Sequence, residues 1–171
     1  MGLLRRSQNR LSEAKLELET AIALDRNNAL AIAQLGQTLI WMGQPEAGIA
    51  RIEKAIRLDP HNPGMPTRYW ELGACHLLLE HVDEAIDLFR KGRAGGPGLY
   101  FIHYWLAGAP GLKSDLEEAR AELAASLKLQ PEINSVAQWR HAVPWATNPQ
   151  YLALEEKTLD IGLRRAGFAD E

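Results

Sequence analysis

The chain repeats itself with a period close to 34 residues, and this period limits its possible folds more than any other feature. Four anchor positions lie 34, 37 and 34 residues apart: Gly2, Gly36, Gly73 and Ala107. Small or apolar residues follow each anchor at offsets of 12, 16 and 19 residues, and proline follows three anchors at an offset of 24. In chain order these residues are Ala14, Leu18 and Ala21; Gly48, Ile52, Ala55 and Pro60; Ala85, Phe89, Gly92 and Pro97; Ala119, Leu123, Ser126 and Pro131.

The spacing within each copy predicts a pair of antiparallel helices. Small side chains let two helices approach closely, and the larger apolar residue fills the space beside them. Proline then stops the second helix of the pair. We expect no strands, a capping box of Ser114 and Glu117, and helices over 12–25, 29–42, 46–58, 66–80, 82–94, 99–108, 114–129, 133–142 and 149–165.

With this pattern the sequence resembles the tetratricopeptide repeat (TPR) family, whose unit is a helix-turn-helix of 34 residues. The resemblance covers residues 1–131, as a truncated copy at 1–28 and further copies at 29–65, 66–98 and 99–131. Three extra residues fall in the proline-containing turn between the second and third copies. We therefore expect an all-α, right-handed solenoid of about four helix pairs, closed by C-terminal capping helices within residues 132–171.

The tail after the last copy leaves the period and is predicted to form this cap. We expect an inward apolar stripe with polar neighbours turned outward: Tyr151, Leu152, Leu159 and Leu163 inward, Glu155, Glu156 and Lys157 outward. The stretches 148–152 and 162–168 resemble the C-terminal segment that follows TPRs in bacterial class III adenylate or guanylate cyclase-like proteins and related regulators. That resemblance implies a larger bacterial signalling protein with a cyclase or DNA-binding domain upstream. This chain itself lacks the mixed sheet and the metal-binding aspartates of a cyclase.

The first copy begins at Gly2, where the later copies are already in the middle of a helix. A solenoid needs a polar cap over each end, and the sequence shows none here. We therefore expect a chain cut from a longer protein that forms a homodimer through its uncovered apolar end. The residues expected to be exposed there are Leu3, Leu4, Leu11, Leu16 and Leu18.

Composition excludes several classes of protein. With 46% hydrophobic and 24% charged residues among 171, the chain can form a core, and its net charge of −3 is not that of a dedicated nucleic-acid binder. The short basic runs near Arg5 and Arg90 are interpreted as solvated helix faces. The single cysteine, Cys75, excludes an internal disulfide and indicates a reducing cytoplasm. No apolar stretch approaches the roughly 20 residues needed to span a membrane, so we expect no membrane segment.

No phosphate-binding loop, nucleophile elbow or zinc-protease motif occurs in the sequence, so we expect a non-enzymatic chain without cofactors or metal. The strongest opposing cluster is Cys75, His76, Glu80 and His81. His76 and Glu80 lie four residues apart on one helix face, but two ligands do not make a metal site. A metal-dependent enzyme using His76 and Glu80, or the TPR half of a transcriptional regulator, remains the alternative.

The family resemblance implies that the first helix of each pair lines a concave groove for a protein or peptide partner. Carried over to this chain, the groove residues are Gln37, Ile40, Trp41, Trp70, Ala74, Leu78, Phe101 and Tyr104. The cationic clamp that binds chaperone C-termini is missing, so we expect an extended or helical apolar or aromatic segment, fixed by Gln37. Alternatively, Trp70 and Tyr104 are packing residues or are covered by the C-terminal helix. If the groove is open, Trp41→Ala and Tyr104→Ala should weaken partner capture and leave helicity nearly intact.

Overall fold

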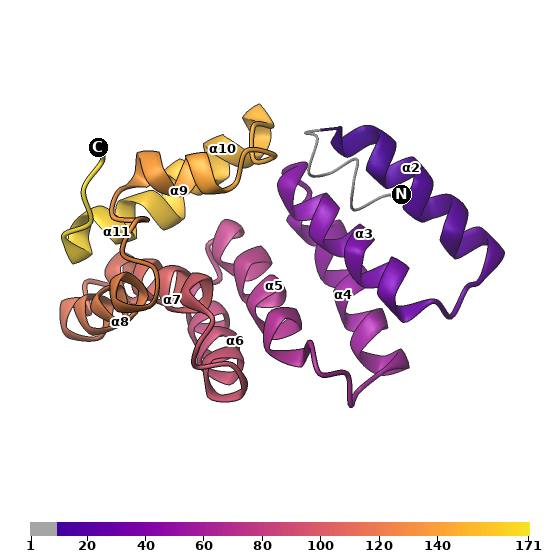
Figure 1. Ribbon diagram of the computed structural model, residues 1–171, viewed down its shortest axis with the longest axis horizontal. Coiled ribbons are helices and arrows are strands. Elements are labelled where there is room, and N and C mark those ends of the chain that lie inside the picture. Colours follow the sequence, from indigo (N-terminus) through magenta and orange to yellow (C-terminus); the bar gives the residue numbers. More distant parts are fainter. Residues whose placement is uncertain (1–9) are drawn as a thin grey trace.

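The computed structural model describes residues 10–171, which form a curved array of helices (Figure 1). The helices are α2 (Leu11–Leu24), α3 (Ala29–Trp41), α4 (Pro45–Leu58), α5 (Met65–Leu78), α6 (Val82–Gly95), α7 (Tyr100–Leu112), α8 (Leu116–Leu129), α9 (Val136–Ala142), α10 (Pro149–Glu155), the π-helical turn η1 (Glu156–Asp160) and α11 (Ile161–Ala166). Within this range the only β pairing is an isolated bridge between Ser135 and Ala169. The predicted all-α solenoid is confirmed.

Three helix pairs, α3 with α4, α5 with α6 and α7 with α8, stack along the array. The predicted small residues lie where the two helices of a pair approach most closely. A Cβ added at Gly36 would lie 2.6 Å from Cγ1 of Ile52, and one added at Gly73 would lie 2.6 Å from the Phe89 ring. The period in the sequence therefore reflects these contacts, because a larger residue at the anchor would push the pair apart.

Helix α2 stands at the N-terminal end of the array and packs against α3. Leu18 joins Leu35 and Leu39 in a small apolar cluster, and Leu11 reaches the main core. The expectation that Leu11 and Leu18 are exposed is therefore wrong, because Leu11 packs into the main core and Leu18 packs against α3, whereas Leu16 is exposed as expected. The predicted apolar positions Leu3 and Leu4, and the anchor Gly2, lie outside the described residues.

Two helix boundaries near residue 110 differ from the prediction. Helix α7 does not stop at 108 but continues through Pro110 to Leu112. Pro110 lies in the last turn, where its missing N–H costs one bond, and burial of this turn offsets that cost. Helix α8 is capped by Asp115, whose side chain accepts from the Glu118 amide at 3.4 Å. The predicted cap, Ser114, instead takes a left-handed conformation with φ 64°, so it cannot start the helix.

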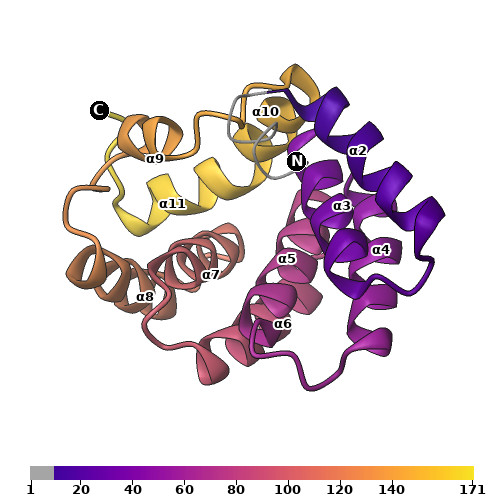
Figure 2. The same ribbon diagram turned by 45° about the vertical axis from the view of Figure 1, so that its right-hand side comes forward.

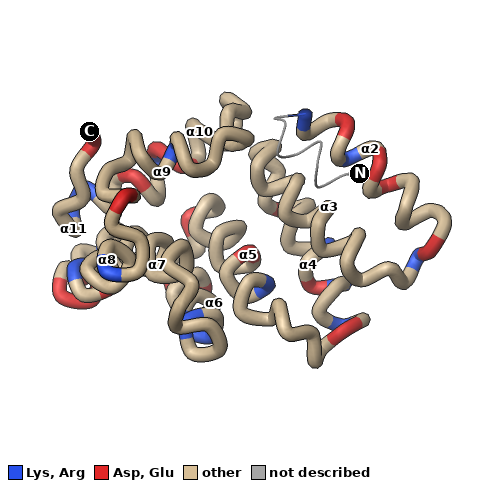
Figure 3. The backbone as a smooth tube through the Cα atoms, viewed as in Figure 1, with Lys and Arg blue, Asp and Glu red and all other residues tan. Residues whose placement is uncertain are grey.

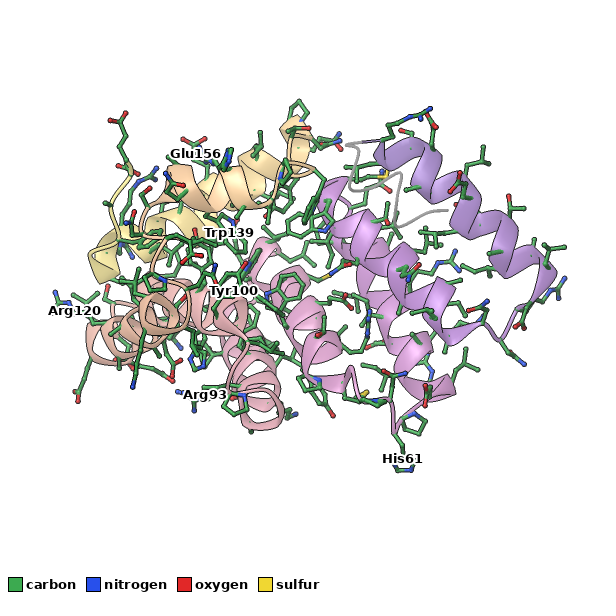
Figure 4. The ribbon with its side chains drawn as sticks, viewed as in Figure 1. His61, Arg93, Tyr100, Arg120, Trp139 and Glu156 are labelled. Carbon is green, nitrogen blue, oxygen red and sulfur yellow. The ribbon has the colours of Figure 1, made fainter. Side chains whose placement is uncertain are left out.

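The C-terminal residues form one helical path from α10 through η1 to α11, with α9 beside it. Figures 1 and 2 place α10 near one end of α3 and α11 beside α7, so the path crosses the array. Tyr151, Leu159 and Leu163 are buried as predicted. Glu155, predicted to point outward, is buried, because it lies four residues after Tyr151 and shares its face. Its neighbour Glu156 is exposed (Figure 4).

Candidate functional site

The predicted groove residues lie on α3, α5 and α7, the first helices of the three pairs. Gln37 and Phe101 are partly exposed. The other six are buried: Ile40, Trp41, Trp70, Ala74, Leu78 and Tyr104. These six belong to one apolar core cluster, so most of the predicted groove residues do not face solvent.

The chain's own C-terminal segment covers Tyr104 and Trp41 with aromatic side chains. The Trp139 ring of α9 stacks on Tyr104 with 4.2 Å between centroids, and Phe168 meets Tyr104 edge-on at 5.5 Å. Tyr151 of α10 meets Trp41 edge-on at 5.0 Å. The alternative in which the C-terminal helices cover Tyr104 therefore describes this part of the groove.

The path from α10 to α11 runs along the C-terminal ends of α3, α5 and α7. A Cβ at Gly43, after α3, would lie 2.7 Å from Cβ of Gln150. Lys157 donates to Glu80, in the turn after α5, at 2.5 Å, and Arg165 donates to the carbonyl of Leu112, the last residue of α7, at 2.8 Å. The C-terminal path is thus fixed to all three pairs.

A pocket of about 300 Å³ remains open between the first helices and the segment around α9. Its lining combines predicted groove residues with residues that the repeat pattern could not indicate: Gln37, Trp41, Thr67, Trp70, Tyr100, Phe101, Trp139, Ala142, Val143 and Trp145. Figure 4 labels Tyr100 on α7 and Trp139 on α9. The sequence signal for the second group was the presence of two tryptophans, Trp139 and Trp145, in a short segment outside the period.

Aromatic rings form a continuous arc in the walls of this pocket. Trp145 lies 6.3 Å from Trp41, which lies 6.4 Å from Trp70. Trp70 meets Phe101 edge-on at 4.9 Å, and Phe101 meets Tyr100 at 5.8 Å. Trp41 and Trp70 are only 3% and 5% exposed. Buried neighbours therefore hold two of these rings in place before any ligand arrives.

The tryptophans of the lining differ from one another in the hydrogen bonding of their indole N–H groups. Nε1 of Trp139 donates to Glu155 at 3.3 Å. In contrast, Nε1 of Trp41, Trp70 and Trp145 is buried and has no hydrogen-bond partner among the described residues. Three unmatched donors thus belong to rings that line one pocket.

A polar cluster links α9 to the path from α10 to η1. Tyr151 donates to Glu155 at 2.7 Å, and Arg140 donates to Asp160 at 2.8 Å. Burial raises the pKa of Glu155 to about 7, and the bonds from Tyr151 and Trp139 act in the opposite direction. Burial likewise raises the pKa of Asp160, while Arg140 opposes the effect.

The proposed metal ligands do not form a site. Cys75 is buried in the core, and burial raises the pKa of its thiol well above the usual value. Glu80 is exposed and pairs with Lys157, while His76 lies beside His81 at 5.6 Å between ring centroids. In residues 10–171, no group of three or more His, Cys, Asp or Glu side chains gathers to hold a metal ion. The metal-dependent alternative therefore has no support.

Basic and acidic residues are interspersed along the helices (Figure 3). Arg90 donates to Glu118 at 2.6 Å, and Arg93 pairs with Glu122. These pairs account for two cations of the basic run near Arg90. Of the helices between residues 10 and 171, none has both the length and the apolar character that crossing a membrane requires.

Comparison with known proteins supports the same architecture. Residues 5–63 match the tetratricopeptide repeat family, and no curated protein sequence matches the chain. The fold is similar to a crystal structure of MamA, with 17% sequence identity, 98% of both chains covered and a TM-score of 0.66. It is also similar to YrrB, described as a TPR protein with an unusual peptide-binding site, with 20% identity, 94% of this chain and 82% of that chain covered, and a TM-score of 0.62. The APC/C hetero-tetramer Cut9-Hcn1 matches with 19% identity, 85% of this chain and 28% of that chain covered, and a TM-score of 0.73. At these identities the likeness establishes a TPR fold. It gives no support to a transcriptional regulator.

Proposed function

We propose that this chain, which has the fold of tetratricopeptide-repeat proteins, is a non-catalytic module that binds a protein or peptide segment in the aromatic pocket. The observation that carries the proposal is the pocket of about 300 Å³ that stays open after the C-terminal segment has covered part of the predicted groove. TPR solenoids generally act as binding surfaces rather than as enzymes. Binding here uses Gln37, Trp41, Trp70 and Phe101 from the predicted groove, with α9 and Trp145 as the opposite wall.

The chemistry of the lining supports binding at this pocket. Tryptophan and tyrosine offer large, rigid apolar surfaces and carry a disproportionate share of binding energy in interfaces. Phe101 and Trp145 are partly exposed, so a partner can contact them without unfolding the chain. Trp41 and Tyr104 are buried, and their truncation to alanine should instead cost about 3–5 kcal/mol of stability.

The test is a peptide-display selection against the intact chain, followed by affinity measurements on purified variants. We expect Phe101→Ala to weaken the selected peptides by roughly 30-fold, the effect of losing about 2 kcal/mol at a hot spot. Leu129→Ala is the control, because Leu129 of α8 is exposed and does not line the pocket. Equal affinity of the Phe101→Ala variant and the intact chain for every selected peptide would contradict the proposal.

We further propose that the module belongs to a larger cytoplasmic bacterial signalling protein with a nucleotide cyclase domain upstream. The support is the resemblance of stretches 148–152 and 162–168 to the segment after cyclase-associated TPRs. The test is to read which domain, if any, the parent gene encodes upstream of these repeats. A gene that encodes no domain before these repeats would contradict it.

A homodimer through the N-terminal end is also proposed. Leu16 and Leu24 of α2 and Leu30 of α3 are exposed at this end, although Leu11 and Leu18 are not. Light scattering at increasing concentration should show the dimer, and Leu16→Lys should abolish it. A monomer at all concentrations would contradict this proposal.

A further inference from the structure

We infer that Glu155 is a positioning residue of the aromatic pocket and that its carboxyl proton couples binding to pH, so that the chain binds its partner more tightly when Glu155 is protonated. This inference rests on the proposed function and adds to it the regulation of the same pocket. Its basis is the hydrogen bond from Trp139, which lines the pocket, to the buried carboxyl group of Glu155.

Glu155 connects one wall of the pocket to the C-terminal path. Its Oε1 atom accepts from Nε1 of Trp139 at 3.3 Å and from the hydroxyl of Tyr151 at 2.7 Å. The Trp139 ring lines the pocket and stacks on Tyr104, whereas Glu155 itself does not line the pocket. A change at this carboxyl group therefore reaches a partner through the placement of Trp139 rather than by direct contact.

The balance of buried charges indicates that Glu155 carries a proton. The carboxyl groups of Glu155 and Asp160 are 1% and 0% exposed, and Arg140 is the one cation bonded to either of them among the described residues. Arg140 donates to Oδ2 of Asp160 and so compensates that charge. Oε2 of Glu155 is buried and has no hydrogen-bond partner in residues 10–171. An ionised carboxylate in this position is costly, so the pair retains one proton, and Glu155 holds it.

The π-helical turn η1 explains why the two carboxyl groups act on each other. Glu155 directly precedes this turn and Asp160 ends it, so the two residues are five positions apart. In an α-helix, side chains five positions apart point about 140° away from each other. A π-helix instead joins residue i to residue i+5 across one turn, which brings them to one face. Both carboxyl groups are therefore buried on the same side of the path.

The pKa of Glu155 agrees with this charge balance. Burial is the largest cause that raises this pKa to about 7, and Asp160 raises it as well, while the bonds from Tyr151 and Trp139 act in the opposite direction. The carboxyl group therefore changes its charge near neutral pH. The titratable and charged groups that act on this pair of carboxyls are Tyr104 of α7, Arg140 of α9, Tyr151 of α10, Glu156 of η1, Arg164 of α11 and Asp170 of the C-terminal tail.

A partner in the pocket favours the protonated form of Glu155 for two reasons. It replaces water at the Trp139 ring, so the carboxyl group bonded to that indole is buried more deeply, and deeper burial disfavours the charged form. Ionisation also leaves a buried charge under α9, which supplies Trp139, Ala142 and Val143 to the pocket, and so makes the closed position of this wall less favourable. By linkage, binding takes up a proton, and affinity falls as the pH rises through 7.

The experiment measures binding of N-acetyl-L-phenylalanine methylamide, an uncharged aromatic probe that does not titrate, to the intact chain at pH 6 and pH 8. We expect the dissociation constant to rise about three- to tenfold between these values, where tenfold is the limit for one proton lost near pH 7. Glu155→Gln keeps an acceptor for Trp139 and Tyr151 without a charge, so it should bind the probe equally at both pH values. Glu156→Gln is the matched control, because Glu156 is exposed on the same path, and it should retain the pH dependence.

NMR of the chain labelled with ¹⁵N-tryptophan follows the proton itself. The indole N–H signal of Trp139, assigned with Trp139→Phe, should titrate near pH 7, because its acceptor changes charge there. Trp105, buried in the core without a bond to Glu155, is the internal control. Asp160→Asn should move the midpoint to lower pH, because Asp160 raises the pKa of Glu155. An unchanged or higher midpoint in this variant would overturn the charge balance and with it the inference.

Three further outcomes would overturn the inference and leave the proposed function standing. These are equal affinity of the unmodified chain for the probe at pH 6 and pH 8, the same pH dependence in Glu155→Gln, and no binding of the probe at either pH. Circular dichroism checks that each variant is folded, and the titration of Trp139 in the unmodified chain needs no change at Glu155. Absence of that titration would also overturn the inference. The display selection with Phe101→Ala tests the proposed function independently.

Discussion

Glycine residues determine how closely α11 approaches α7. A Cβ added at Gly162 would overlap the carbonyl of Gly108, and one added at Gly111 would overlap the backbone of Gly162. The obstructing atoms belong to backbone, so no side-chain rotation can make room. The contact between α7 and α11 therefore depends on the absence of side chains at these positions.

We expect Gly162→Ala to lower the free energy of unfolding by about 1–3 kcal/mol, because the added methyl forces the two helices apart. The measurement is urea unfolding followed by circular dichroism. Gly98→Ala is the matched control, since nothing lies within 4 Å of a Cβ at Gly98. Equal stability of the two variants would show that the helices can separate without loss.

At the level of single elements, two substitutions at the start of α8 show which residue caps the helix. Asp115→Ala should cost about 1 kcal/mol, because its carboxylate accepts from the Glu118 amide. Ser114→Gly should cost nothing or stabilise the chain, because glycine tolerates the left-handed conformation seen at φ 64°. Thermal unfolding of both variants checks this. A larger loss from Ser114→Gly would restore Ser114 as the cap.

The stability of the path from α10 to α11 should depend on pH through Glu155. The pKa of Glu155 is raised from 4.5 to about 7 in the folded chain by burial, so folding favours the protonated form. Its contribution to stability is therefore greatest below about pH 4.5 and is lost as the pH rises through 7. Between these two pH limits the contribution of Glu155 to the free energy of unfolding changes by about 3 kcal/mol. Asp160, Arg140, Tyr104 and Tyr151 are the titratable or charged groups that act on Glu155.

Glu155→Gln keeps the acceptor for Tyr151 and Trp139 but removes the charge. We expect its stability to change much less between pH 5 and 8 than that of the unmodified chain, as measured by urea unfolding at several pH values. Glu156→Gln is the control, because Glu156 is exposed on the same path. An unchanged pH dependence in the Glu155→Gln variant would contradict this assignment.

The elements that the sequence could predict are those whose packing repeats. The contact of Gly36 with Ile52 recurs as that of Gly73 with Phe89, so the same spacing locates both pairs. The continuation of α7 through Pro110 and the burial of Glu155 follow from contacts made once, with residues distant in sequence. A contact that is made only once leaves no repeating pattern in the sequence. For the same reason the sequence left two alternatives for Trp70 and Tyr104, and the cover of Tyr104 by Trp139 and Phe168 could not be predicted.

Over the whole molecule, the C-terminal path gives this solenoid a long-range connection. In a simple solenoid each repeat contacts only its neighbours, so stability varies along the array and the ends open first. Here the path contacts Gly43 and Glu80 in the turns after α3 and α5, and Leu112 at the end of α7. Local opening of the path therefore removes contacts from three pairs at once. Helix α2 packs mainly against α3.

Native-state hydrogen exchange should reveal this coupling. We expect the amides of α10 and α11 to open with the same free energy as those of α7, and the amides of α2 to open at lower free energy. Gly162→Ala should then reduce protection not only in α7 and α11 but also around Gly43, far away in sequence, because the path contacts both. The Gly98→Ala chain gives the baseline. If Gly162→Ala affects only α7 and α11, the array behaves as a nearest-neighbour solenoid, and the C-terminal path is an end cap without a connecting role.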